Sequence, residues 1–223
     1  MEMMPFQPSA PLSDAAPTWV PLPTWGLPTS DWTAGLPVLG DATVTLRELE
    51  LADAPTLCAQ LTTEEVSRFI SPPPTSVEGF ERFIRWTHTR RAQGRYACFG
   101  VVPAGQTHAV GLFQLHVDDT DAQTAEWGFV LGQAYWGTGL FLTGARRVVN
   151  FAFAAMGLTR LVAHAAVPNG RGNGALRKLG ARQVGMRPQG LERHGAKLDQ
   201  HIWTLVRDDW WGGLATCWHR TVH

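Results

Sequence analysis

From residue 41 onward, the hydrophobic positions follow two periods, one of about two residues and one of three to four. Alternating or continuous apolar runs predict strands at 44–49, 96–102, 109–117, 124–131, 158–167, 181–186 and 197–206. Apolar positions three and four residues apart predict helices at 53–61, 62–70, 76–94, 140–156 and 169–179. This order predicts a mixed, mostly antiparallel central sheet of about seven strands with helices on both faces, an α/β fold of the layered α+β type.

Short polar residues at the starts of these helices are expected to cap them. Asp53 and Ser76 each precede an apolar periodic segment, and the oxygen of such a side chain accepts a hydrogen bond from the first turn. Thr62 is followed three residues later by Glu65, which is the spacing of a capping box. We therefore predict helix starts at these three positions.

The first 40 residues have a different composition. They contain 8 of the 15 prolines, no Lys or Arg, and the tryptophans Trp19, Trp25 and Trp32. Proline lacks the N–H that a helix needs, whereas disordered segments are usually poor in aromatic residues. We expect residues 1–36 to form an extended segment that packs on the domain or on a partner chain, with an unstructured leader as the alternative. Residues 37–211 then form one domain and 212–223 a tail.

Composition excludes several classes of protein. The 19 basic and 19 acidic side chains balance, which argues against a nucleic-acid binder with a basic face. No apolar run approaches the roughly 20 residues of a membrane-spanning helix, and the N-terminus lacks the pattern of a secretory signal. Cys58, Cys98 and Cys217 are widely spaced, which is typical of reduced thiols. We expect a cytoplasmic protein that binds neither nucleic acid nor membrane.

The zero net charge conceals an asymmetry along the chain. Residues 1–145 carry 7 basic and 15 acidic side chains, whereas residues 146–223 carry 12 basic and 4 acidic ones. We expect an anionic ligand to contact the second half of the chain. The alternative is that surface charges are unevenly placed along the chain without any functional consequence.

A glycine-bearing loop follows the apolar run 124–131 and leads into a predicted helix. The free N–H groups at a helix start attract anions, and Gly137 and Gly139 allow a phosphate to approach the backbone. Gly139 is followed by Leu140 rather than Lys, which excludes a Walker loop. Leu142 stands where a dinucleotide fingerprint has its third glycine, which argues against that motif. On spacing alone, a plain tight turn explains the loop better.

A second glycine cluster lies at 169–180. Its three glycines within the first helical turns each cost about 1 kcal/mol relative to alanine. Close approach by a ligand or a strand is one explanation, and a frayed helix start is the other. Asn169 and Asn173 lie four residues apart and would share one helix face.

Four stretches of the chain, 126–131, 135–141, 169–180 and 198–210, together resemble the GNAT N-acetyltransferase superfamily, and within it the RimJ/RimL type. The resemblance covers about residues 36–210. It implies a GNAT-like fold, acetyl-CoA as the cofactor, and direct acetyl transfer to a primary amine in a ternary complex. The acceptor would be a protein N-terminus or a small amine. The resemblance leaves a homodimer open.

The resemblance also implies the site residues. Glu126 occupies the position of the carboxylate that faces the acceptor amine, although an ordinary strand carboxylate is the alternative. Acceptor contacts are expected from Phe69, Ile70, Trp86 and Trp127, with core packing as the alternative for Phe69 and the two tryptophans. The basic charge of the second half, rather than a family motif, leads us to expect further phosphate contacts from Arg146, Arg147, Arg171 and Lys178. The expected cofactor-binding residues are Phe129, Val130, Leu131, Trp136, Gly137, Thr138, Gly139, Leu140, Phe141, Leu142, Thr143, Asn169 and Asn173. No metal ligands are expected, because no H-E-x-x-H motif occurs.

Two departures from the family pattern concern the general acid. Gly172 stands where the family has a serine, and Leu176 lies near the position of a tyrosine in other branches. These departures motivate an alternative of another class, a non-catalytic domain that binds or senses acyl-CoA. The Trp-rich N-terminal segment motivates a third alternative, a partner-binding module.

Overall fold

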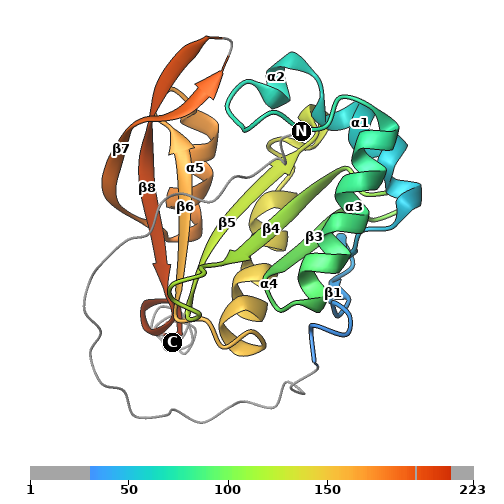
Figure 1. The fold of residues 1–223 in the computed structure, drawn as a ribbon, viewed down its shortest axis with the longest axis horizontal. Helices are drawn as coiled ribbons and strands as arrows, with labels where there is room; N and C mark the ends of the chain where they lie inside the picture. The colour runs from blue at the N-terminus through green and yellow to red at the C-terminus, as the bar shows by residue number, and fades with distance from the viewer. Residues whose placement is uncertain (1–30, 194, 212–223) are drawn as a thin grey trace, which may run out of the picture.

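The computed structural model describes residues 31–193 and 195–211. The described strands form one sheet in the order β1-β2-β3-β4-β5-β6-β8-β7 (Figure 1). Only the pairing of β5 with β6 is parallel, and the other neighbours are antiparallel. The strands are β1 (Leu39–Gly40), β2 (Val44–Glu48), β3 (Tyr96–Pro103), β4 (Gly111–Val117), β5 (Thr124–Leu131), β6 (Arg160–Ala166), β7 (Arg182–Arg193) and β8 (Ala196–Val206).

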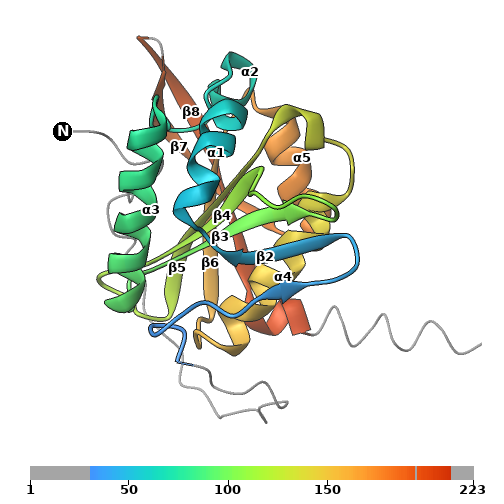
Figure 2. The same ribbon diagram turned by 90° about the vertical axis from the view of Figure 1, so that its right-hand side faces the viewer.

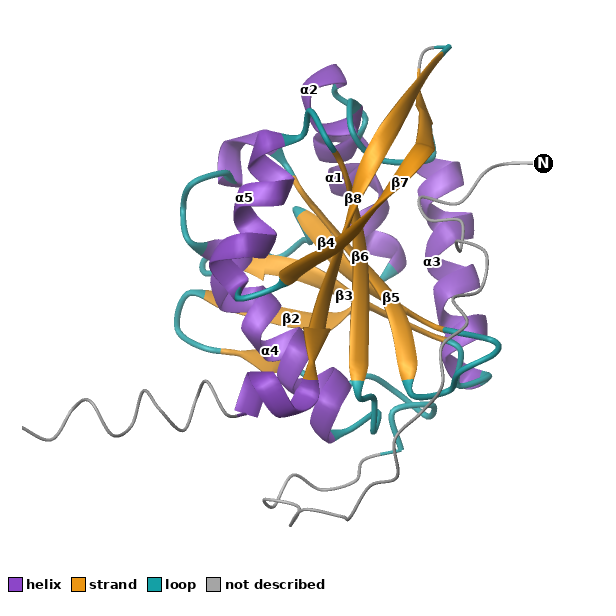
Figure 3. Cartoon of the chain, turned by 90° about the vertical axis from the view of Figure 1, so that its left-hand side faces the viewer, coloured by secondary structure: helices purple, strands orange, loops and turns teal. Residues whose placement is uncertain are grey.

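Helices cover both faces of this sheet. They are α1 (Ala54–Leu61), α2 (Glu64–Ser67), α3 (Val77–Ala92), α4 (Leu140–Ala154) and α5 (Gly170–Leu179), with 3-10 turns at Leu51–Asp53 and Gln133–Tyr135. Figures 2 and 3 show α1 and α3 on one face and α4 and α5 on the other. The predicted layered α/β fold is therefore confirmed. The short strand β1 is an addition to the seven strands that periodicity predicts.

Two apolar cores explain why the central strands are buried on both faces. Phe99, Phe113 and Phe151 belong to the core beneath α4. Phe80 and Phe83 belong to the core beneath α1 and α3. Every residue of β3 is buried as a consequence, which gives a continuous apolar run instead of an alternating one.

The cap at Ser76 is confirmed, because its Oγ accepts a hydrogen bond of 3.1 Å from the Gly79 N–H. Asp53 stands at the N-cap position of α1 as predicted, but its side chain makes no capping hydrogen bond to that helix. The cap predicted at Thr62 is wrong. The Thr62 hydroxyl donates to the carbonyl of Cys58, and α2 begins after Thr63 without a side-chain cap.

The Asp53 carboxylate accepts hydrogen bonds from the Arg47 guanidinium at 2.8 and 2.9 Å and from the N–H groups of Glu50 and Ala109. Asp53 is completely buried, so its negative charge requires these partners. The ion pair with Arg47 joins β2 to the segment that begins α1, and this is the role that replaces the predicted cap.

The ends of the chain are described only in part. Trp32 packs against the apolar core beneath α4, as expected of a tryptophan that lies on the domain. Trp19, Trp25 and the predicted tail at 212–223 lie outside the described residues. Among the described helices, none combines the length and the apolar character that crossing a bilayer requires.

The parallel strands β5 and β6 separate along their length, and this separation positions the site. They pair only where Thr124–Glu126 lie beside Arg160–Val162, whereas β5 remains paired with β4 as far as Leu131 (Figure 1). The edge of β5 from Trp127 to Leu131 therefore has no strand partner on the β6 side. Backbone groups along such an edge can bind an extended ligand.

Candidate active site

A groove of about 810 Å³ opens where β5 and β6 separate. Its volume lies in the range of small-molecule sites. One wall is the loop at 133–139 with the start of α4, and the opposite wall is the first half of α5. The predicted cofactor-binding residues that line the groove are Phe129, Val130, Leu131, Trp136, Gly137, Gly139, Phe141, Leu142 and Asn169.

The loop before α4 has the conformation of an anion site. Gly137 has φ 76° and Gly139 has φ 88°, a left-handed region that favours glycine. Gly139 caps α4 without a side chain, and the first backbone bond of the helix runs from the Thr143 N–H to the Gly139 carbonyl. The N–H groups of 140–142 therefore have no acceptor within the helix, and the first turn contains no acidic residue.

Basic side chains face this loop across the groove. The Arg171 guanidinium lies 3.7 Å from the centre of the Trp136 ring, and Lys178 lines the same groove. The Trp136 indole N–H donates a 2.9 Å hydrogen bond to the carbonyl of Leu131, which fastens the loop to the end of β5. The two walls thus bring a fixed aromatic ring and positive charge together.

The other predicted phosphate contacts lie elsewhere. Arg147 pairs with Asp41 at 2.8 Å. Neither it nor Arg146 lines the groove.

These residues fit acetyl-CoA. The free N–H groups at the start of α4 suit a pyrophosphate, and the unpaired edge of β5 suits the amide groups of a pantetheine arm. Arg171 and Lys178 add positive charge for phosphate oxygens. When bound, acetyl-CoA supplies a thioester whose thiolate is a good leaving group.

Some predicted cofactor residues lie off the groove. Thr138, Leu140 and Thr143 do not line it, and the Thr138 hydroxyl donates to the Tyr135 carbonyl at 2.8 Å. These residues still belong to the loop and first helical turn whose backbone forms the anion site.

Asn173 is buried, with an exposed fraction of 6%, and its amide is saturated by protein partners. Its Nδ2 donates to the carbonyls of Ala166 and Asn169, and its Oδ1 accepts from the Trp203 indole and contacts His201 Nδ1. This corrects the expectation that the Asn173 amide contacts the cofactor. The residue instead holds α5 against β6 and β8.

Asn169 explains the glycine at the family's serine position. Its Oδ1 accepts a 2.9 Å hydrogen bond from the Gly172 N–H and so caps α5. A Cβ atom added to Gly172 would lie 2.6 Å from Asn169 Nδ2. A side chain at 172 would therefore have to displace the capping side chain of Asn169, whereas the sequence offered close approach by a ligand or a strand, or a frayed helix start, as reasons for the glycines.

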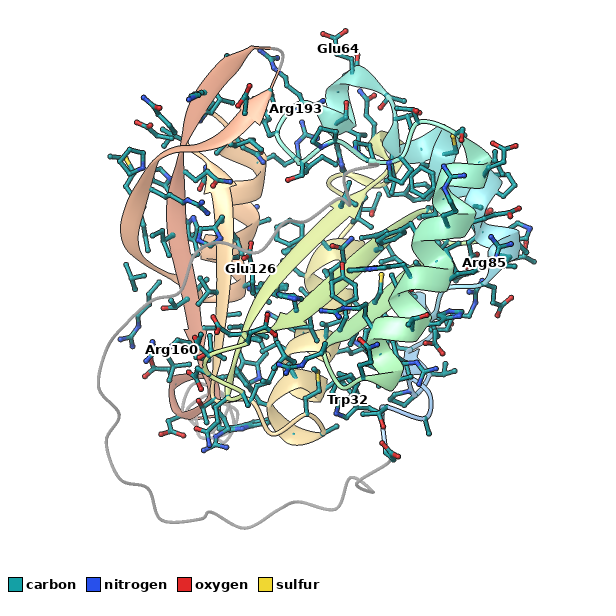
Figure 4. The ribbon with its side chains drawn as sticks, viewed as in Figure 1. Trp32, Glu64, Arg85, Glu126, Arg160 and Arg193 are labelled. Atoms are coloured by element: carbon teal, nitrogen blue, oxygen red, sulfur yellow. The ribbon has the colours of Figure 1, made fainter. Side chains whose placement is uncertain are left out.

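A smaller cavity of about 90 Å³ adjoins the groove and contains Glu126. Glu126 lies between β5 and β6, where the two strands begin to separate (Figure 4). Its Oε1 lies 3.2 Å from Nδ1 of His164, and the side chains are 14% and 8% exposed. Phe69, Ile70 and Asn169 line both this cavity and the groove, so the two spaces share walls.

The predicted acceptor contacts divide between cavity and core. Phe69, Ile70 and Trp127 line the small cavity, although Trp127 is only 1% exposed and mainly packs in the core. Trp86 lies away from it, with its ring 4.8 Å from that of Tyr96 in the core beneath α3. The core interpretation therefore applies to Trp86, because the face of α3 that carries it packs on β3.

His164 was missed by sequence reasoning. It belongs to an apolar run that predicts only a strand buried on both faces. Its place beside Glu126 depends on the register in which Glu126 pairs with Val162. No periodic signal specifies the register between two strands that lie more than 30 residues apart.

A split mixed sheet, a glycine loop at a helix start and a partly buried carboxylate where the strands separate define the class of acyl-CoA-dependent N-acetyltransferases. Comparison with known proteins agrees. The family described as "Acetyltransferase (GNAT) domain" matches residues 43–182, and the chain belongs to this family. It therefore transfers an acetyl group from acetyl-CoA to an amine, and nothing supports the non-catalytic alternative.

The chain is similar to several bacterial proteins. It is 23% identical to the uncharacterized N-acetyltransferase p20 of Bacillus licheniformis, over 76% of this chain and 96% of that protein. It is 26% identical to the putative ribosomal N-acetyltransferase YdaF of Bacillus subtilis (strain 168), over 76% and 94%. The structure of Mycobacterium smegmatis RimJ in complex with CoA-disulfide has a TM-score of 0.69 at 18% identity, over 77% and 88%. This last likeness shows the shared fold.

Proposed function

We propose that the protein acetylates the α-amino group of a peptide or protein N-terminus, in the small cavity that contains Glu126. The observation that carries this proposal is the position of the Glu126 carboxylate. It lies in a cavity that shares walls with the groove and at the point where the unpaired edge of β5 begins. An amine held there would meet a thioester arriving along that edge.

The cost of deprotonating the acceptor favours an α-amine. An amine attacks a thioester only in its neutral form. An α-amine titrates near 7.7–8.0 and a lysine side chain near 10.4, so deprotonation at pH 7 costs about 1 kcal/mol for the first and about 4.6 kcal/mol for the second. The cavity is lined by a single carboxylate, that of Glu126, within the described residues. A single carboxylate can more readily offset the smaller cost, that of deprotonating an α-amine.

The size of the cavity argues against a polyamine. A volume of about 90 Å³ corresponds to roughly three water molecules, which is enough for an amine and a small first residue.

In this proposal, the chain's own groups carry out three tasks. The N–H groups at the start of α4, with Arg171 and Lys178, bind the phosphates. The edge of β5 orients the thioester and offers an N–H to the developing oxyanion. Glu126 activates the amine, directly or through an intervening group. We also place the protein in the cytoplasm, an assignment that the free thiols of Cys58 and Cys98 support.

The test is acetylation of a panel of amines, followed by mass spectrometry. Peptides with a free N-terminal Ala or Ser should be acetylated, whereas N-terminally blocked peptides with an internal lysine, and spermidine, should react at least tenfold more slowly. Glu126→Gln should lower turnover by about 10²–10⁴-fold with little change in CoA affinity. The control is Glu81→Gln, which alters an exposed carboxylate paired with Arg85 on α3. Preferential acetylation of spermidine would contradict the proposed acceptor.

A further inference from the structure

The Glu126–His164 pair points to a division of labour that the sequence does not suggest. We infer that Nε2 of His164 accepts the proton of the acceptor amine and that Glu126 holds the imidazole in the tautomer that makes this possible. This inference rests on the proposed function and makes His164 a catalytic residue.

The contacts of the two ring nitrogens differ. His164 Nδ1 lies 3.2 Å from the Glu126 carboxylate. The Nε2 atom has no hydrogen-bond partner among the described residues. In the described part of the chain, the fully buried polar side-chain atoms without a partner belong to Arg90, Gln114 and Arg193. His164 Nε2 is not one of them, so this unpaired nitrogen is not fully buried. His164 lines the small cavity, and the proposed role places its Nε2 toward the acceptor amine in that cavity.

Elementary chemistry then fixes the roles. A neutral imidazole has one N–H and one lone pair, and a carboxylate beside Nδ1 favours the N–H at that position. The lone pair consequently lies on Nε2. A histidine oriented by a carboxylate in this way is the usual base of hydrolytic triads. The lone pair of a neutral imidazole is a stronger base than a carboxylate, which suits it to accept a proton from an ammonium group.

Several ionisable groups surround this pair. His116 on β4 lies directly opposite Glu126 in the register of the sheet, and Tyr96 on β3 lies opposite His116. Arg187 on β7 lines the same cavity, and His201 on β8 contacts Asn173. Burial lowers the pKa of His116, whereas nearby Asp119 and Glu126 act to raise it. Because several histidines lie near Glu126, a fall in the rate at low pH can be assigned to one of them only by substituting each in turn.

The proposed step balances as follows. The acceptor enters as R–NH3⁺ and gives one proton to His164 Nε2. The neutral amine attacks the thioester carbonyl, so that the C–N bond forms and the C–S bond breaks. The second N–H proton passes to the departing thiolate to give CoA–SH. The imidazolium then releases its proton to solvent, and the sum is the acetylated amine, CoA–SH and H⁺.

The test compares matched histidine variants. His164→Gln should lower kcat by 10²–10⁴-fold and remove the acidic limb of the kcat/KM profile, while CoA affinity changes less than twofold. His116→Gln is the control: it makes the same replacement on the other side of Glu126, at a residue that does not line the cavity, and it should retain both activity and the limb. Added imidazole should restore part of the activity of His164→Gly. Combining Glu126→Gln with His164→Gln should cost little more than His164→Gln alone.

Other results would overturn the inference. Turnover of His164→Gln within threefold of the unmodified protein, with Glu126→Gln inactive, would assign the proton to Glu126 and leave the proposed function intact. If the unmodified protein acetylates no peptide N-terminus, the proposed function itself fails. The tautomer can also be measured by 15N NMR of the unmodified protein, which does not depend on the folding of any variant. A neutral His164 protonated at Nδ1 is expected, and protonation at Nε2 would refute the inference.

Discussion

Replacing Gly139 with alanine tests how the loop before α4 binds the pyrophosphate. Gly139 has φ 88°, and a Cβ added there would meet no atom within 4 Å. The substitution therefore causes no collision, and its cost is backbone strain of about 1–2 kcal/mol. If the loop relaxes in the free protein, binding of CoA must restore the strained conformation. Because 1.4 kcal/mol corresponds to a factor of ten, CoA should bind about 5–30-fold more weakly.

Gly157→Ala is the matched control. Gly157 has φ 73°, and an added Cβ there also meets nothing within 4 Å. It lies just beyond the other end of α4, a 15-residue helix about 22 Å long, away from the groove. Gly157→Ala should lose stability in thermal unfolding, whereas Gly139→Ala should lose less, because its loop relaxes in the free protein. Only Gly139→Ala should weaken CoA binding in isothermal titration calorimetry, and equal CoA affinities for the two variants would refute the role of the loop.

Three further predictions concern Asp53 and Arg171. Asp53→Asn removes the buried anion of Arg47 and leaves only the exposed Glu50 carboxylate, 3.6 Å away. It should lower the free energy of unfolding by about 3–5 kcal/mol in urea titrations; a loss below 1 kcal/mol would count against it. Burial acts to raise the pKa of Asp53, but its hydrogen bonds with Arg47 and two N–H groups lower it on balance. Its stabilisation is thus complete above the unfolded-state pKa of about 3.9 and is lost as pH falls through the lower folded-state pKa; urea titrations between pH 5 and 2 should show this loss in the unmodified protein and not in Asp53→Asn. Arg171→Ala should weaken CoA binding about 3–10-fold, and more at low salt, because it removes a cation stacked on Trp136. The control is Arg177→Ala, which should leave CoA binding unchanged. The Arg177 guanidinium lies 5.7 Å from the Trp203 ring and does not line the groove.

Periodicity predicted the elements well where local sequence determines them. The strand at 124–131 has the bounds that were predicted, and Ser76 caps α3 as expected. Caps failed where a tertiary partner competed for the side chain. The sequence indicates that Asp53 caps a helix, but its carboxylate instead accepts hydrogen bonds from Arg47 on β2 and from the N–H of Ala109. Local patterns contain no information on such distant partners.

For the site, the sequence indicated the groove but not the side-chain contacts that depend on distant parts of the chain. Family resemblance led to the groove, since most of the residues it implied line it. It did not reveal that a side chain at 172 would have to displace that of Asn169, because that contact depends on the geometry of the α5 cap. Nor did it reveal His164, which reaches Glu126 only through the register of β5 and β6.

The most direct test of the account is a crystal structure of the protein with CoA bound. We expect the pyrophosphate on the N–H groups at the start of α4, the pantetheine along residues 129–131, and the sulfur at the mouth of the cavity that contains Glu126 and His164. A CoA molecule bound outside the groove, or a sulfur that faces away from this cavity, would contradict it.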